Sequence, residues 1–147
     1  MFVADTNILL YAADASSTAH DRCRSLVDGW RRGNRPWHLT WPIVYEFMRV
    51  VTHPRVFRTP WSLPLAWSFV RGLLAASSIT VLTATPQHDE ILEELIGTAP
   101  TFAGNIIHDL HTVVLMREHG VRTIYTRDTD FHRFHGIEVL DPLSPAG

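Results

Sequence analysis

The first fourteen residues, MFVADTNILLYAAD (1–14), join a short apolar run to three polar residues and then to a second apolar run. Residues 2–4 suit a short buried strand, because all three are apolar and two of them are aromatic or β-branched. Asp5 then places a carboxylate where the next buried residue would stand, and Asn7 follows on the same face of an extended chain. Either a turn or a functional site therefore begins at Asp5.

Short β-like runs alternate with segments of helical periodicity along the rest of the chain. The expected strands span residues 2–5, 37–40, 79–83, 122–126 and 137–140. The expected helices span residues 7–13, 18–32 (capped by Ser16 or Ser17), 42 to just before Pro54, 65–76, 87–96 (ended by Gly97) and 105–119 (ended by Gly120). Strands separated by helices predict a single α/β domain over residues 1–147, with a central parallel sheet of four to five short strands between two layers of helices.

The composition is that of a globular protein, with 46% hydrophobic and 19% charged residues, and excludes a disordered or fibrous chain. Cys23 is the only cysteine, so no disulfide forms within one chain, which fits a reducing cytoplasm. The longest uncharged stretch contains Ser, Thr and Pro and falls short of the roughly 20 apolar residues that span a bilayer. We therefore expect a cytoplasmic protein without a membrane segment.

Charge is distributed unevenly, and all thirteen basic residues other than His are Arg. Residues 1–75 hold nine Arg and five acids (9 − 5 = +4), whereas residues 76–147 hold four Arg and ten acids (4 − 10 = −6). A genome that favours Arg codons explains the missing Lys. The basic half nevertheless fits a nucleic-acid surface, because Arg guanidinium groups make bidentate contacts with phosphates.

Three carboxylates follow predicted strands directly. Asp5 ends the first strand, and Asp128 and Asp130 lie just beyond the fourth strand, in IYTRDTDF. In open α/β sheets, ligands bind outside the carboxyl ends of the strands, where the strand order reverses. We therefore expect Asp5 and Asp128 to lie close together.

Two more carboxylates flank the apolar faces of predicted helices. Glu46 lies three residues after Ile43 in WPIVYEFMRVV, and Asp109 lies three residues after Ile106 in GNIIHDLHTVVLM. At about 100° per residue, each acid stands at the edge of its helix's core face. Acids at a core boundary are costly unless they are paired or bind a cation.

Four such acids on separate elements predict an oxygen-rich site that selects Mg²⁺ or Mn²⁺ over zinc. Water activation and attack on a phosphodiester are the natural chemistry of such a site, so the pattern indicates a metal-dependent nuclease. The alternative is that Asp5 and Asp128 cap turns or helices and that Glu46 and Asp109 are surface acids, paired with Arg49 or Arg117.

The chain resembles the PIN-domain ribonucleases, and among them the VapC toxins of bacterial toxin–antitoxin pairs. The resemblance covers essentially the whole chain and is carried by DTNILLYA, PIVYEFMRVV, GNIIHDLHTVVLMREHG and TIYTRDTDF. It assigns the metal-binding and catalytic quartet to Asp5, Glu46, Asp109 and Asp128. It also matches Thr6 to the family's hydroxyl beside the first acid, Asn7 to its supporting amide, and Asp130 to a further acid of some members.

The sequence departs from the family pattern after the third acid. Relatives often have a small residue there, whereas this chain has Leu110 between Asp109 and His111. His108 and His111 are left with three alternative roles: hydrogen bonds to carboxylates around the site, contacts with RNA, or positions on the helix surface.

The resemblance implies a PIN-like three-layer α/β/α fold and hydrolysis of RNA with Mg²⁺ or Mn²⁺ held by the quartet. The ions would polarise the scissile phosphate and activate a water, which Asp109 or Asp128 would orient, leaving a 3′-hydroxyl and a 5′-phosphate. The implied partners are a VapB-like antitoxin, a second copy of the chain and the RNA substrate.

Contacts with RNA must come from residues outside the quartet. The candidates that could bind phosphate are Arg49, Arg55, Arg58, Arg127 and Arg133. Trp61 or Phe57 could stack on an unpaired base, and the alternative is that both aromatic rings pack on neighbouring helices.

Three other classes of protein are compatible with parts of the pattern. An HD-type phosphohydrolase would explain the adjacent His108 and Asp109, but those folds are all-helical and this chain has several β-like runs. A HAD-like phosphatase would use Asp5 as nucleophile, but it needs a second Asp where Asn7 stands. A catalytically silent PIN-like module that binds RNA or protein would be expected to lose acids from the quartet, and all four are present.

Overall fold

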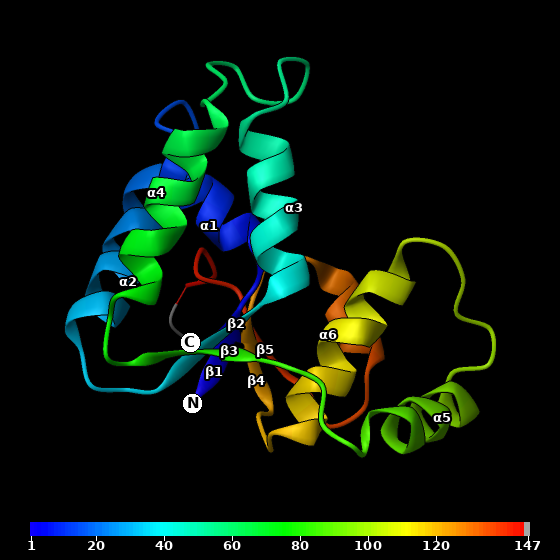
Figure 1. Ribbon diagram of the computed structural model, residues 1–147. Coiled ribbons are helices and arrows are strands. Elements are labelled where there is room, and N and C mark those ends of the chain that lie inside the picture. Colours follow the sequence, from blue (N-terminus) through cyan, green and yellow to red (C-terminus); the bar gives the residue numbers. More distant parts are fainter. Residues whose placement is uncertain (146–147) are drawn as a thin grey trace.

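A five-stranded parallel sheet forms the centre of the computed structural model, which describes residues 1–145 (Figure 1). The spatial order of the strands is β3-β2-β1-β4-β5, and every neighbouring pair is parallel. The strands are β1 (Phe2–Ala4), β2 (Trp37–Thr40), β3 (Ile79–Leu82), β4 (Thr123–Tyr125) and β5 (Glu138–Leu140). The predicted parallel sheet is therefore confirmed.

Within the described residues, six α-helices cover the two faces of the sheet. They are α1 (Thr6–Ala13), α2 (His20–Arg32), α3 (Trp41–Val51), α4 (Leu63–Leu74), α5 (His88–Thr98) and α6 (Ile106–Glu118). Figure 1 shows α1 to α4 gathered on one side of the sheet and α5 and α6 on the other. This arrangement confirms the three-layer α/β/α prediction. No helix among residues 1–145 is long and apolar enough to cross a bilayer.

Strand β1 stands at the point where the strand order reverses. The chain continues from β1 to β2 and β3 on one side and later returns to β4 and β5 on the other. Ala4 pairs with Tyr125 in the β1–β4 register, and the Asp5 backbone N–H donates to the Tyr125 carbonyl at 3.0 Å. This register places Asp5 beside Thr126, at the carboxyl edge where ligands bind in such sheets.

The sequence-based caps of two helices were wrong. The N-cap of α2 is Ala19, which makes no side-chain cap. The Ser16 hydroxyl instead donates to the Asp14 carboxylate at 2.6 Å, and the Ser17 hydroxyl accepts the Ala19 N–H within a local turn. Hydrogen bonds to nearby polar groups thus compete with capping. Helix α5 runs through Gly97 to Thr98, whereas Gly120 follows α6 as expected, with a φ of 68° that favours glycine.

The Pro-rich segment between α3 and α4 is anchored by aromatic packing. Phe57 is buried, and the half-buried Trp61 ring packs edge to face against Phe47, Phe57 and Phe69, with ring centroids 5.6 to 6.3 Å apart. This packing favours the structural interpretation of both rings over base stacking, because both rings already pack against aromatic side chains of the core.

Candidate metal centre

Asp5 is held by three donors at the end of β1. One carboxylate oxygen, Oδ1, accepts the Thr6 backbone N–H at 2.8 Å. The other, Oδ2, accepts the Asn7 side-chain amide at 3.2 Å and the Thr126 hydroxyl at 2.7 Å. Asn7, which the family resemblance matches to a supporting amide, thus donates to Asp5. The Thr6 hydroxyl instead donates to the Ile43 carbonyl at 3.4 Å, which links α1 to α3.

Thr126 is a site residue that the sequence analysis missed. Its buried hydroxyl donates to Asp5 Oδ2, and it accepts from the Asn7 amide at 3.0 Å and from the Asp128 backbone N–H at 2.9 Å. A hydroxyl has one hydrogen and two lone pairs, so all of its hydrogen-bonding capacity is used. Thr126 therefore connects the start of α1 to the segment after β4.

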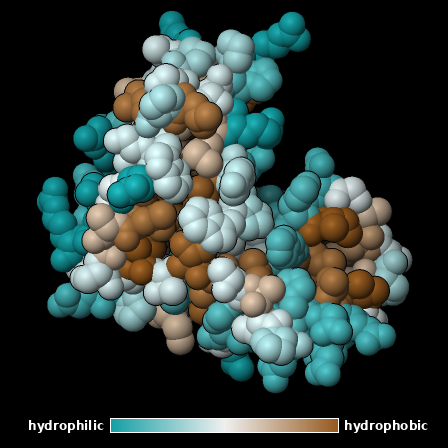
Figure 2. Space-filling view, in the orientation of Figure 1, coloured by the Kyte–Doolittle hydropathy of each residue, from teal (hydrophilic) through white to brown (hydrophobic). Residues whose placement is uncertain are grey.

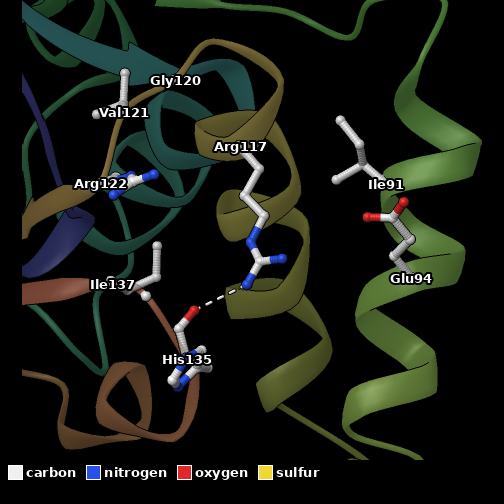
Figure 3. Close-up of a pocket in the computed structure, with 9 residues that line it drawn as sticks. Ile91, Glu94, Arg117, Gly120, Val121, Arg122, His135 and Ile137 are labelled. Carbon is white, nitrogen blue, oxygen red and sulfur yellow. Dashed lines mark hydrogen bonds between the residues drawn. The ribbon is translucent and has the colours of Figure 1, made fainter.

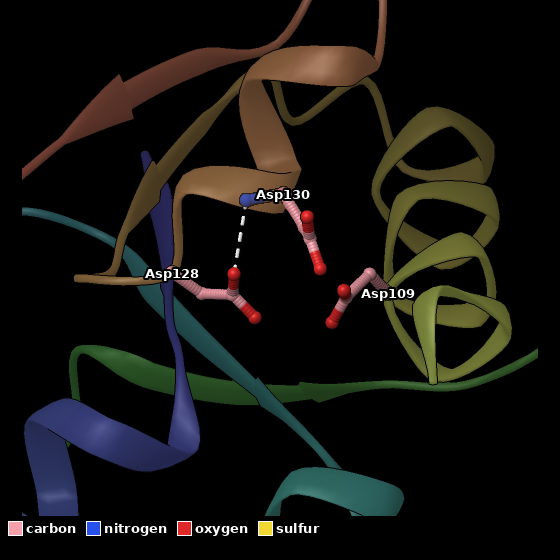
Figure 4. Close-up of side chains that lie close together, drawn as sticks. All are labelled: Asp109, Asp128 and Asp130. Carbon is pink, nitrogen blue, oxygen red and sulfur yellow. Dashed lines mark hydrogen bonds between the residues drawn. The ribbon is translucent and has the colours of Figure 1, made fainter. Parts of the chain in front are cut away.

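Three carboxylates converge beside this network. Asp109, Asp128 and Asp130 each offer an oxygen within 4.8 Å of the others. Figure 4 shows Asp109 extending from α6 toward Asp128 and Asp130, which lie on the opposite side of the cluster. The short 3₁₀ helix η1 (Thr129–Arg133) makes this possible, because Asp128 caps it and accepts the Asp130 N–H at 2.9 Å.

The cluster has the electrostatic character of a cation site. Burial, together with the negative charges of Asp128, Asp5 and Asp130, raises the pKa of Asp109 to about 7. Burial also raises the pKa of Asp5, against the opposing effect of the hydrogen bonds from Thr126 and Thr6. Carboxylates arranged in this way require a proton or a cation, and hard oxygen donors suit Mg²⁺ or Mn²⁺.

The raised pKa of Asp109 predicts a pH-dependent stability in EDTA. Unfolding returns this carboxyl to a pKa of about 3.9, so between pH 4 and 7 the folded chain binds more protons than the unfolded chain. The free energy of unfolding therefore falls as the pH rises through this range. We expect the Tm of the wild type, relative to that of Asp109→Asn, to fall between pH 5 and pH 8 in calorimetry. A constant difference would contradict the raised pKa.

Glu46 lies outside the three-aspartate cluster. It stands on α3, and both of its carboxylate oxygens accept from the Arg49 guanidinium, at 3.0 and 2.7 Å. These hydrogen bonds lower the pKa of Glu46. The alternative pairing with Arg49 is thus present in the structure. Glu46 is nevertheless close enough to the site for its charge to contribute to the raised pKa of Asp5.

Asp109 does not pair with Arg117, which donates instead to the His135 carbonyl at 2.9 Å. Figure 3 shows this bond at the wall of a cavity of about 540 Å³, whose lining includes Ile91 and Glu94 of α5. None of the quartet lines that cavity. Neither Arg49 nor Arg117, the two partners considered from the sequence, therefore pairs with Asp109.

All five candidate arginines are exposed, and three of them also contact neighbouring groups. Arg55 and Arg58 are exposed between α3 and α4. Arg127 lies 3.3 Å from Asp141, and the Arg133 guanidinium lies 4.4 Å from the centre of the Phe102 ring. With Arg49 bound to Glu46, the two loop arginines are the candidates with the greatest freedom to bind phosphate.

The residues around Asp109 on α6 have different surroundings. Leu110 is buried in the core. His111 faces α5, where its ring lies edge to face with His88 at 5.7 Å. His108 is close enough to Glu46 to help lower the pKa of that carboxyl. Of the two histidines, His108 is therefore the one associated with the site.

The PIN domain family model matches residues 2–137. Ribonuclease VapC48 of Mycobacterium tuberculosis is 32% identical over 149 residues, which is 95% of this chain and 96% of its own length. Ribonuclease VapC33 of the same species is 31% identical over 143 residues, covering 97% of this chain and 99% of its own.

Several solved structures have the same fold as this chain. Mycobacterium tuberculosis VapC20, described as a Sarcin-Ricin loop cleaving toxin, has a TM-score of 0.62 at 16% identity over 90% of this chain and 94% of its own. A chain of VapBC2 from Rickettsia felis, bound to a promoter DNA fragment, has a TM-score of 0.65 at 15% identity, with coverages of 95% and 96%. The match to the family model and the identity to full-length relatives show that this chain belongs to the PIN-domain family, among the VapC ribonucleases.

Proposed function

We propose that this VapC-family endoribonuclease toxin requires Mg²⁺, with Mn²⁺ as a substitute, and that Asp5, Glu46, Asp109 and Asp128 hold the ion. The observation that carries this proposal is the convergence of Asp109 and Asp128, with Asp130, to oxygen distances within 4.8 Å at the carboxyl edge of the sheet. The raised pKa of Asp109 supports it, because a divalent cation offsets both the burial and the neighbouring negative charges that raise that pKa.

The residues of the chain have different roles in the proposed reaction. A bound divalent ion supplies the Lewis acidity that polarises the scissile phosphate and activates a water. Thr126 and Asn7 hold the Asp5 carboxylate in one orientation. Asp109 or Asp128 accepts a hydrogen bond from the attacking water and aligns it with the phosphorus. The exposed Arg55 and Arg58 bind phosphates of the RNA.

The proposed partners are a VapB-like antitoxin, an RNA substrate and a second copy of the chain, in the cytoplasm. Several similar structures are toxin–antitoxin complexes, which supports the antitoxin. Exposed apolar side chains on α4, namely Leu63, Leu65 and Trp67, offer surface for a protein partner. Figure 2 shows brown hydrophobic surface among polar residues on the side of the molecule where Figure 1 places α2 and α4.

The proposed activity is tested by incubating total cellular RNA with the purified, antitoxin-free chain. We expect discrete fragments with Mg²⁺, none with EDTA and none with Asp5→Asn, whereas the exposed α5 variant Asp89→Asn cuts like the wild type. Sequencing the fragment ends identifies the cleaved RNA. Fragments that survive both EDTA and Asp5→Asn would contradict the metal centre, and no cleavage by well-folded protein would favour a module that only binds.

A further inference from the structure

The contact between Glu46 and Arg49 differs from the other helical ion pairs of residues 1–145. Arg49 Nε donates to one carboxylate oxygen and its terminal nitrogen donates to the other, at 3.0 and 2.7 Å. Arg24 and Asp28 on α2 make a single long contact of 3.9 Å. The Glu46 carboxylate thus has a geometrically matched cation on both of its oxygens.

This arrangement conflicts with the role of Glu46 in the quartet. A carboxylate whose charge is already matched by a guanidinium is a weaker ligand for a divalent cation. Glu46 is also absent from the group of acids whose oxygens lie within 4.8 Å of one another. Its carboxylate must therefore leave Arg49, at least in part, when it joins the metal centre.

Separation of Glu46 from Arg49 costs little free energy, because both side chains are exposed. The side chains of Arg49 and Glu46 are 60% and 47% exposed. Solvent-exposed ion pairs contribute little to stability, because water screens most of the attraction between the two charges. Both residues lie on α3, so rotation of their side chains separates the pair.

We propose that Arg49 is a positioning residue that holds Glu46 as an internal counter-ion before the divalent ion binds, and then releases it and turns its guanidinium to a phosphate of the RNA. This inference rests on the proposed function. It predicts two opposite effects of one substitution: loss of Arg49 strengthens binding of the ion alone and weakens binding of RNA.

The first test measures Mn²⁺ binding to the RNA-free chain by electron paramagnetic resonance. We expect Arg49→Gln to bind Mn²⁺ about two- to fivefold more tightly than the wild type at low ionic strength, and the gain to shrink in 0.5 M salt because the pair is screened. Arg24→Gln is the matched control, since it removes an Arg from another helical ion pair, and it leaves Mn²⁺ affinity unchanged. In the Glu46→Gln background, Arg49→Gln has no further effect.

The second test observes Arg49 directly and then in turnover. Titration of wild-type chain with Mg²⁺ shifts the Arg49 Nε–H resonance in NMR away from its ion-paired position. In RNA cleavage at saturating Mg²⁺, Arg49→Gln raises KM by about tenfold with a smaller change in kcat, as expected for a lost bidentate phosphate contact. Arg49→Lys retains the charge but not the paired donors, so its KM lies between the two.

The possible results distinguish failure of this inference from failure of the proposed function on which it rests. Unchanged or weaker Mn²⁺ binding by Arg49→Gln overturns the counter-ion role, although the metal centre stands if Asp109→Asn and Asp128→Asn abolish binding. A wild-type chain that binds no Mn²⁺ overturns both. An unaltered KM in Arg49→Gln overturns the phosphate contact alone. Circular dichroism of each variant shows that a change in binding does not come from unfolding.

Discussion

Replacement of Asp109 by Asn is expected to reduce RNA cleavage by about 10³-fold or more. Asp109 reaches the cluster from α6, whereas Asp128 and Asp130 come from the segment after β4, so it supplies the only carboxylate from that side of the three-aspartate group. Loss of a carboxylate removes negative charge that stabilises the ion, and an ion contributes several kcal/mol to transition-state stabilisation. About 4 kcal/mol corresponds to a factor of 10³ in rate.

The same substitution should not destabilise the protein. An amide fills the same space and carries no charge, so it avoids both the burial of a charge and the repulsion that together raise the pKa of Asp109 to about 7. At pH 8 in EDTA, we expect the Tm of Asp109→Asn to equal or exceed that of the wild type. Cleavage rates and calorimetry on the same samples check both expectations. Retention of more than about a tenth of the activity would show that the cluster does not hold the catalytic ion.

Replacement of Thr126 by Val is expected to affect both stability and cleavage. Val has a similar shape but no hydroxyl, so Asp5 loses a donor, and the Asn7 amide and the Asp128 N–H lose an acceptor. Unsatisfied buried groups cost about 1 to 3 kcal/mol, and changes behind a metal ligand cost about 10- to 100-fold in affinity or activity. We expect losses of these sizes in denaturant unfolding and in RNA cleavage.

Thr126→Ser is the matched control because it retains the hydroxyl and loses only a methyl group. It should keep most of the activity and Mn²⁺ affinity, with a smaller loss of stability. If Ser and Val lower cleavage equally, the methyl group rather than the hydrogen bonds would be responsible. If Val lowers stability but not Mn²⁺ binding, Thr126 would be a structural residue without influence on Asp5.

The periodicity of the sequence predicted the fold well, for a physical reason. The strands of a parallel sheet are buried on both faces, so they appear as short apolar runs such as FVA in β1, whose residues are fully buried. Helices that cover a sheet have one apolar face, as in α3. Caps were harder to predict, because Ser16 and Ser17 had other acceptors and donors within reach.

The candidate site was predicted in part. Asp5 could be identified as a candidate because it lies at the end of a strand. Asp109 could be identified because it lies at the edge of the apolar face of its helix. Thr126 had no such signal, because a Thr at the end of a strand is common and its role depends on the β1–β4 register. The pairing of Glu46 with Arg49 was one of two alternatives that sequence spacing leaves open, and only side-chain geometry shows that both oxygens are engaged.

The sequence by itself determined the order of elements, the parallel sheet and the set of acids near its carboxyl edge, since these depend on local patterns of apolar and charged residues. Tertiary structure decided which acids meet. Asp109 is almost twenty residues from Asp128 along the chain, and they converge because α6 and η1 pack against each other. Such convergence depends on packing between distant segments. This packing buries Asp109 and brings it close to the other acids, and both effects raise its pKa.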